Sequence, residues 1–259
     1  MINSQNKLKI FQKKKEGLSF SRFEIKYVLS KELSKIIQNK ISIFMSLDDF
    51  ARDFQNNEYF VRSLYFDSDK FNNFHQKTDG LKIRYKFRIR TYSKKLDHSS
   101  VLFLEKKGRY NERTYKVRKK INNQNYKIFI NEENKMNLST DYNKDPLIDQ
   151  FIFDYYKKKI KPKVIIDYFR KPYINKTGVY FRLTFDSQLN SIANKDLFPQ
   201  NHQFIKTIPG YEILEVKFDR TIPPWFQKII QSYDLKRLSV SKFVLSCEAT
   251  KLAYDFEGR

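Results

Sequence analysis

The sequence predicts an α+β protein, built as an antiparallel β-barrel with flanking helices. Two observations support this fold class. At least seven segments alternate apolar and polar residues with a period of two, which is typical of strands that bury one face. Amphipathic segments with helical spacing lie between them. The chain has 259 residues, enough for one large domain, although two domains are also compatible with this length.

The predicted strands share one pattern, an apolar face opposite a polar face that is rich in Arg and Lys. They span residues 23–29, 81–91, 102–107, 114–118, 164–170, 179–186 and 213–219. A closed or nearly closed sheet of such strands would turn the polar faces into its lumen and the apolar faces toward the helices. We therefore expect a barrel with a basic interior.

The segment 81–91 carries a cation at every second position. These cations are Lys82, Arg84, Lys86, Arg88 and Arg90, about 7 Å apart on one face. Neighbouring charges at that spacing repel by about 0.6 kcal/mol in water and by about 2.4 kcal/mol at an effective dielectric constant of about 20. On an open, solvated face the row costs little, whereas in a concave site it requires an anion. The repetition of basic faces on other strands favours the anion site.

Three predicted strands also place a carboxylate two residues before a lysine. The pairs are Glu24 with Lys26, Glu105 with Lys107, and Glu215 with Lys217. A carboxylate on an anion-binding surface weakens anion affinity unless it holds a metal ion or orients a neighbouring Arg or Lys. Both roles are open at this point.

Helices are predicted at four places. Ser30 caps a helix whose apolar residues continue to Phe44, and a short helical turn is expected within 69–76. Asp145-Pro146 and Pro223-Pro224 each begin a further helix, because proline is favoured in the first turn.

The remaining stretches define the predicted domain organisation. Residues 122–125, 131–145 and 187–203 are rich in Asn and are expected to be loops. Residues 1–20 form a basic N-terminal arm, and residues 21–259 are expected to form one domain.

The charge balance points to a polyanionic partner. Lys and Arg number 51 against 29 Asp and Glu, a formal net charge of +22. Nucleic acid, phosphate-rich small molecules, polyphosphate and an acidic membrane surface are the candidates. Cys247 is the one cysteine and is expected in the core, which excludes an internal disulfide and a cysteine-rich zinc site. No apolar run is long enough to span a membrane and no secretory signal is evident, so a cytoplasmic location is expected.

An ordered series of motifs resembles a known family. The series is Arg-Phe-Glu-Ile-Lys-Tyr at 22–27, Val-Arg-Ser-Leu-Tyr-Phe-Asp at 61–67, Gly-Leu-Lys-Ile-Arg-Tyr-Lys-Phe-Arg-Ile-Arg at 80–90, Phe-Leu-Glu-Lys-Lys at 103–107, Tyr-Lys-Val-Arg at 115–118, Tyr-Phe-Arg at 180–182, Leu-Glu-Val-Lys at 214–217 and Ser-Val-Ser-Lys-Phe at 239–243. It resembles the polyphosphate-polymerase domain of the vacuolar transporter chaperone (VTC) family, a branch of the triphosphate tunnel metalloenzymes. The resemblance implies a tunnel-type barrel that binds a chain of phosphates, with Mn²⁺ or Mg²⁺ as cofactor.

One position differs from the hydrolases and cyclases of that superfamily. Those members typically begin Glu-x-Glu-x-Lys, whereas here Arg22 precedes Glu24 and Lys26. The loss of the first carboxylate weakens a hydrolase-type metal site and is similar to the VTC branch, without excluding triphosphatase activity.

Carried over position by position, the resemblance implies three groups of site residues. The catalytic group is Lys26, Arg88, Arg90, Lys107, Arg182 and Lys242. The further phosphate-binding residues are Arg84, Lys86, Lys116, Arg118, Arg170, Tyr180, Lys217 and Ser241. Glu215 is the implied metal ligand. Glu24 and Glu105 are either further ligands or orienters of Lys and Arg, and the second role is favoured.

The resemblance implies an enzyme that transfers the terminal phosphoryl group of ATP to a growing polyphosphate chain. Its substrates would be ATP and polyphosphate or pyrophosphate, and a membrane-protein partner at the inner face of a membrane is compatible with it. The alternatives are a metal-dependent inorganic or nucleoside triphosphatase and a non-catalytic module that binds polyphosphate or RNA. Nucleic acid as the primary ligand is disfavoured because aromatic residues alternate onto the face opposite the cations, whereas base-stacking surfaces combine the two.

Overall fold

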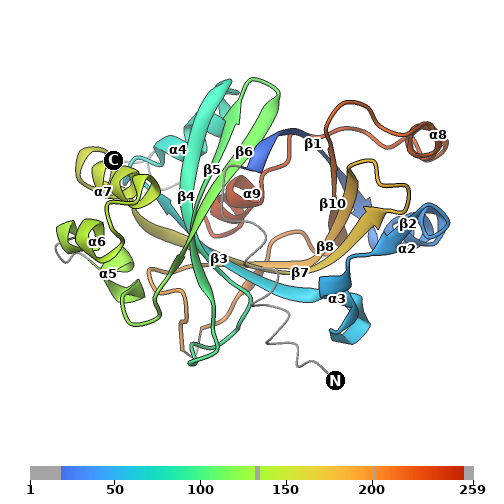
Figure 1. The fold of residues 1–259 in the computed structure, drawn as a ribbon. Helices are drawn as coiled ribbons and strands as arrows, with labels where there is room; N and C mark the ends of the chain where they lie inside the picture. Colours follow the sequence, from blue (N-terminus) through green and yellow to red (C-terminus); the bar gives the residue numbers. More distant parts are fainter. Residues whose placement is uncertain (1–18, 132–134, 201, 254–259) are drawn as a thin grey trace.

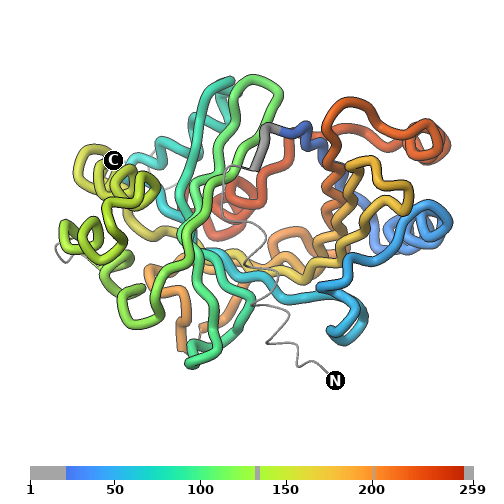
Figure 2. The backbone as a smooth tube through the Cα atoms, in the orientation of Figure 1, coloured from blue at the N-terminus to red at the C-terminus, as the bar shows by residue number. Residues whose placement is uncertain are grey.

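Within the residues that the structure, a computed structural model, describes (19–131, 135–200 and 202–253), ten strands form one antiparallel sheet. The order β7-β3-β4-β5-β6-β1-β10-β8 closes on itself because β8 also pairs with β7. The ring is β1 (Ser19–Ser30), β3 (Tyr59–Asp67), β4 (Ile83–Thr91), β5 (Leu102–Tyr110), β6 (Arg113–Ile121), β7 (Lys161–Asn175), β8 (Phe181–Ala193) and β10 (Tyr211–Phe218), flanked by β2 (Met45–Leu47) and β9 (Ile205–Lys206). The closed ring is visible in Figures 1 and 2 and confirms the predicted barrel.

Most helices lie between these strands in the sequence, and the last two follow β10. They are α2 (Lys31–Ile41), α3 (Asp49–Arg52), a 3₁₀ turn η1 (Gln55–Asn57), α4 (Asn72–Thr78), α5 (Tyr126–Ile130), α6 (Met136–Asp141), α7 (Pro146–Lys158), α8 (Pro224–Ser232) and α9 (Lys242–Ala249). The predicted caps are present, since the Ser30 hydroxyl accepts the Leu33 N–H and the Asp145 carboxylate accepts the Leu147 N–H. In the described part of the chain, no helix has the length and apolar character that a membrane crossing needs.

Two hydrophobic cores lie outside the barrel, on opposite sides of it in Figure 1. On one side α5, α6 and α7 cover the outer faces of β3 to β6, with Phe151 of α7 against Phe66 and Phe87. On the other side α2 and α8 cover β1, β8 and β10, with Ile37 and Phe226 fully buried. The apolar strand faces therefore contact the helices, as predicted.

A third core lies within the ring and is formed around α9. Phe243 and Cys247 of this helix are buried against β3, β7 and α4, and the Phe243 and Tyr65 rings are 5.3 Å apart. Cys247 is thus a core residue, as expected. This packing sets Lys242, at the start of α9, against the lumen.

Two predicted loops contain regular structure, so these predictions were wrong in part. Residues 136–141 form α6, which is held by the fully buried Leu138. Residues 187–193 continue β8, because Ile192 pairs with Ile165 of β7. In both cases tertiary contacts outweigh an Asn-rich composition. Residues 1–18 of the predicted basic arm lie outside the described residues.

Candidate functional site

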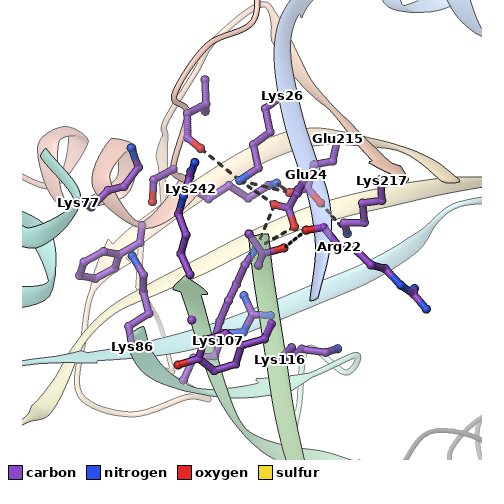
Figure 3. Close-up of a pocket in the computed structure, with 18 of the residues that line it drawn as sticks. Arg22, Glu24, Lys26, Lys77, Lys86, Lys107, Lys116, Glu215, Lys217 and Lys242 are labelled. Carbon is purple, nitrogen blue, oxygen red and sulfur yellow. Dashed lines mark hydrogen bonds and ion pairs between the residues drawn. The ribbon is translucent and has the colours of Figure 1, made fainter. Parts of the chain in front are cut away.

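A cavity of about 690 Å³ occupies the lumen of the barrel. All eight strands of the ring contribute lining side chains, and α4 and α9 add others. Because successive residues of a strand point to opposite faces, closure of the ring brings the polar faces of distant segments into one space. Figure 3 shows these charged side chains converging from several strands.

The cavity collects nearly all of the site residues predicted from sequence. Its lining includes Lys26, Arg84, Lys86, Arg88, Arg90, Lys107, Lys116, Arg118, Arg170, Tyr180, Arg182, Lys217, Ser241 and Lys242, together with Glu24 and Glu215. Glu105 is fully buried behind this surface rather than on it. Lys82, the first cation of the alternating row, is exposed and lies outside the cavity.

One wall of the lumen is strongly basic, and we call the inner faces of β4, β5 and β6 the cationic wall. Its charged residues are Arg84, Lys86, Arg88, Arg90, Glu105, Lys107, Arg109, Lys116 and Arg118. They are aligned in cross-strand rows: Arg84 faces Arg109, and Lys86, Lys107 and Lys116 form the next row. Like charges opposite one another in a sheet are destabilising, so this wall is suited to an anion.

Glu105 holds the central arginine of the cationic wall. Its Oε2 accepts hydrogen bonds from Arg88 Nε at 2.8 Å and Nη2 at 2.6 Å, while Lys116 Nζ lies 3.4 Å from Oε1. Arg88 Nη1 also donates to the Tyr65 hydroxyl at 2.6 Å. Although burial opposes ionisation, Lys116 and Arg88 hold the pKa of Glu105 well below its ordinary value. This geometry favours the orienting role for Glu105 over metal binding.

The facing wall, on β1, β7, β8 and β10, mixes carboxylates with cations. Glu215 Oε1 accepts from Lys242 at 2.8 Å, and Oε2 lies 3.1 Å from both Arg170 and Lys217. Burial acts against its charge, but Lys242, Lys217 and Arg170 keep the pKa of Glu215 well below its ordinary value. Asp186 of β8 is fully buried outside the cavity lining, and it also pairs with Arg170 and Lys242.

Glu24 completes this mixed wall and links it to the opposite side. Its carboxylate lies 3.2 Å from Lys107 Nζ of the cationic wall and 3.3 Å from Lys26 Nζ of its own strand. Burial raises the pKa of Glu24, but Lys107 and Lys26 outweigh it and keep the pKa far below the ordinary value. Glu24 and Glu215 share Lys26, which lies 3.8 Å from Glu215.

Burial lowers the pKa values of the inward-facing lysines of the cationic wall. Burial, only partly offset by Glu105, lowers the pKa of Lys116 to about 7. Burial likewise lowers the pKa of Lys86 and of Lys107 to about 8. An anion in the lumen would favour their charged forms, so these lysines are poised to gain protons when phosphate binds.

Residues 21–251 match the model of the VTC domain. The chain belongs to the VTC family. The resemblance predicted from the ordered motifs is therefore confirmed.

A solved structure of low sequence identity shares the fold of this VTC domain, and another is similar to it. A putative adenylyl cyclase from Hippeastrum, described as having a dominant triphosphatase activity, is 13% identical with a TM-score of 0.50, and the match covers 88% of this chain and 96% of that one. A putative adenylate cyclase from Bacillus halodurans is 15% identical with a TM-score of 0.47, over 87% of this chain and 95% of that one. No curated protein matches the chain significantly.

Arg22 lines the cavity in the lumen of the barrel. Its guanidinium carbon lies 3.7 Å from the centroid of the Tyr180 ring, and its Nε lies 3.5 Å from Asp219. Where the sequence departs from the Glu-x-Glu-x-Lys pattern, the side chain is thus a stacked cation at the cavity surface.

The carboxylates present fit a metal ion that arrives with phosphate. In the described parts of the chain, no group of three or more His, Cys, Asp or Glu side chains could hold a metal. A carboxylate has about four lone-pair positions, and those of Glu215 already accept Lys242, Arg170, Lys217 and the Thr184 hydroxyl. Mg²⁺ is commonly bound by one or two carboxylates plus substrate phosphates. For Glu215, with Glu24 beside it, to hold an ion in that mode, a bound phosphate would have to take over Lys242, Lys217 or Arg170 and so free lone pairs of the carboxylate.

Several lining residues were not predicted from sequence. Lys77, Arg109 and Arg237 are cations of the cavity; only Arg109 carried a signal, because it continues the alternation of Glu105 and Lys107. Aromatic side chains also line the lumen, so the expectation that they stay on the opposite face was wrong in part. Tyr65 and Tyr168 use their hydroxyls, which accept from Arg88 and Arg90 respectively.

Proposed function

We propose that this VTC chain is a polyphosphate polymerase, which transfers the terminal phosphoryl group of ATP to a growing polyphosphate chain inside the barrel. The observation that supports this most is the extent of the cationic wall. From Arg84 to Arg90 the row extends along β4 for about 20 Å, at a rise of about 3.3 Å per residue. A triphosphate group is shorter, so the wall has room for the phosphates of a donor and an acceptor in one line.

The proposed reaction exchanges one phosphoanhydride bond for another. A terminal oxygen of the acceptor chain bonds to the γ-phosphorus of ATP, the bond from that phosphorus to the β–γ bridging oxygen breaks, and ADP leaves with the electron pair. Such transfer depends on positioning and on neutralising charge at the phosphoryl oxygens. Planar guanidinium groups bind two phosphate oxygens at once, which suits Arg88 and Arg90.

The buried carboxylates hold these cations in place before substrate binds. Glu105 fixes Arg88, and Glu215 with Asp186 fixes Lys242 and Arg170. Preorganised charges need no rearrangement as charge develops. Glu215, with Glu24 beside it, would hold Mn²⁺ or Mg²⁺, which when bound supplies further charge neutralisation at phosphate oxygens.

Incubation of the purified chain with ATP and Mn²⁺, followed by gel separation of phosphorylated products, tests the proposal. We expect a phosphate ladder and ADP. Orthophosphate without chain growth would instead assign a triphosphatase, and tight polyphosphate binding without either product would assign a binding module. Lys107→Ala should abolish the ladder, whereas Lys106→Ala, which alters the next residue on the outer face against Tyr85, should preserve it.

A further inference from the structure

A second group of cations lies at the rim of the cavity, away from Glu215. We call Lys77, Arg84, Arg109 and Arg237, with the carboxylate Glu112, the mouth cluster; all of them line the same cavity. The Arg237 and Glu112 side chains are 60% and 63% exposed, whereas that of Arg88 is 7% exposed. The mouth cluster therefore marks the solvent end of the cationic wall.

The mouth cluster has more positive charge than its one carboxylate can balance. Arg109 Nη2 and Arg237 Nη2 both lie 3.1 Å from the same Glu112 oxygen. Lys77 donates to the neutral Ser239 hydroxyl at 2.6 Å, and Arg84 donates to the backbone oxygen of Leu81.

Burial, together with repulsion between the cations of the mouth cluster, lowers the pKa values of two of them. Arg84 and Arg109 are directly opposite in the β4–β5 register, a destabilising arrangement for like charges. Burial, followed by repulsion from Arg84, lowers the pKa of Lys77. Burial and repulsion from Arg109 lower the pKa of Arg84. An anion at the rim would relieve this repulsion.

We propose that the mouth cluster is a separate binding site for the distal phosphates of a polyphosphate chain whose reacting end lies at Arg88 and Arg90. This inference rests on the proposed function for the identity of the reacting end. Arg84 is about 13 Å from Arg88 along β4, so a tripolyphosphate bound at Arg88 does not reach the rim, whereas a long chain does.

The surface between the two sites indicates a ligand that is anionic in every unit. The row of Lys86, Lys107 and Lys116 joins the mouth cluster to Arg88 without a break in positive charge. Polyphosphate matches such a path, while RNA would also have to place bases in the lumen. Contacts at the rim retain the chain between successive additions, so the mouth cluster favours the growth of long products from one binding event.

Calorimetry without nucleotide tests this inference with two ligands, tripolyphosphate and a long-chain polyphosphate. Lys77→Ala combined with Arg237→Ala should weaken long-chain binding about tenfold or more, because a charge-assisted contact is lost at each position. Tripolyphosphate affinity should change by less than about twofold. Glu112→Gln should strengthen long-chain binding, because it removes the one negative charge of the mouth cluster.

A matched control removes the same charge elsewhere. Lys35→Ala combined with Lys228→Ala takes two exposed lysines from α2 and α8 and should leave both affinities unaltered. Equal losses for the short and the long ligand, or no loss for either, would overturn the inference. So would a single-stranded RNA that competes as well as polyphosphate does. The calorimetry contains no ATP, so its result does not depend on chain growth. If the ATP assay shows no chain growth, the polymerase is refuted and the binding result stands. If the mouth cluster does not bind long chains, this inference is refuted and the polymerase stands.

Discussion

Arg88→Ala should destabilise the protein as well as inactivate it, because Arg88 is the principal partner of a fully buried carboxylate. Glu105 has no solvent exposure and receives two hydrogen bonds from Arg88. After the substitution, the cations left beside it among the described residues are Lys116, at 3.4 Å, and Arg90, at 3.9 Å. Removing one partner of a buried ion pair costs about 3–5 kcal/mol. For a domain of this size, about 2–4 °C per kcal/mol gives a fall in Tm of roughly 6–20 °C.

The assay compares chemical denaturation and thermal unfolding of Arg88→Ala, Arg118→Ala and the double variant Arg88→Ala/Glu105→Gln. Arg118 is the matched control, because it faces Glu105 from β6 but stacks on the Phe103 ring at 4.5 Å. Its loss should cost about 1 kcal/mol or less. Glu105→Gln should restore part of the stability lost in Arg88→Ala, since it removes the uncompensated charge. Equal unfolding free energies for Arg88→Ala and Arg118→Ala, without rescue, would refute the reasoning.

Three other predictions concern the lumen and its supporting strands. Glu215→Gln should lower turnover and weaken the Mn²⁺ dependence; an unaltered metal titration with weaker metal-free polyphosphate binding would assign Glu215 a purely orienting role. Because burial lowers the pKa of Lys116 to about 7 and a bound anion raises it again, polyphosphate binding at about pH 8 should take up protons. Calorimetry in buffers of different ionisation enthalpy measures this uptake, which Lys116→Gln should reduce. Gly108→Ala should cost about 1–3 kcal/mol because the new Cβ would overlap the Tyr115 ring; denaturation of Gly108→Ala/Tyr115→Ala should show recovery if this overlap is the cause.

Local sequence patterns predicted seven of the eight ring strands and most of the contents of the lumen. They missed β3, because nearly all of its residues are buried and no alternation of apolar and polar residues marks it. The alternation from Arg84 to Arg90 sets which side chains share a face, and ring closure then places that face inside. Ser30 and Pro146 likewise marked helix starts because capping depends on neighbouring residues. Those features need only local geometry.

The partners of the charges could not be predicted in the same way. The three Glu-x-Lys pairs look alike in sequence, yet Glu105 is buried behind Arg88 while Glu24 and Glu215 line the cavity. That difference arises from which strands lie opposite one another. Arg237 lies in an irregular segment between α8 and α9, so no periodicity could assign it to the rim. The outcome for each depended on contacts between segments distant in the chain.

The closure of the ring has a consequence for folding kinetics. The meander β4–β5–β6 pairs only neighbours in sequence and so can form early, but it gathers the cationic wall with Glu105 as its one inward carboxylate. Glu24, which pairs with Lys107 of this wall, comes from β1, whose partner strand β10 lies near the opposite end of the described chain, and these strands pair only at closure. During folding, the cations of the cationic wall therefore repel one another until β1 and β10 pair. Multivalent anions should screen this repulsion and accelerate refolding at low ionic strength.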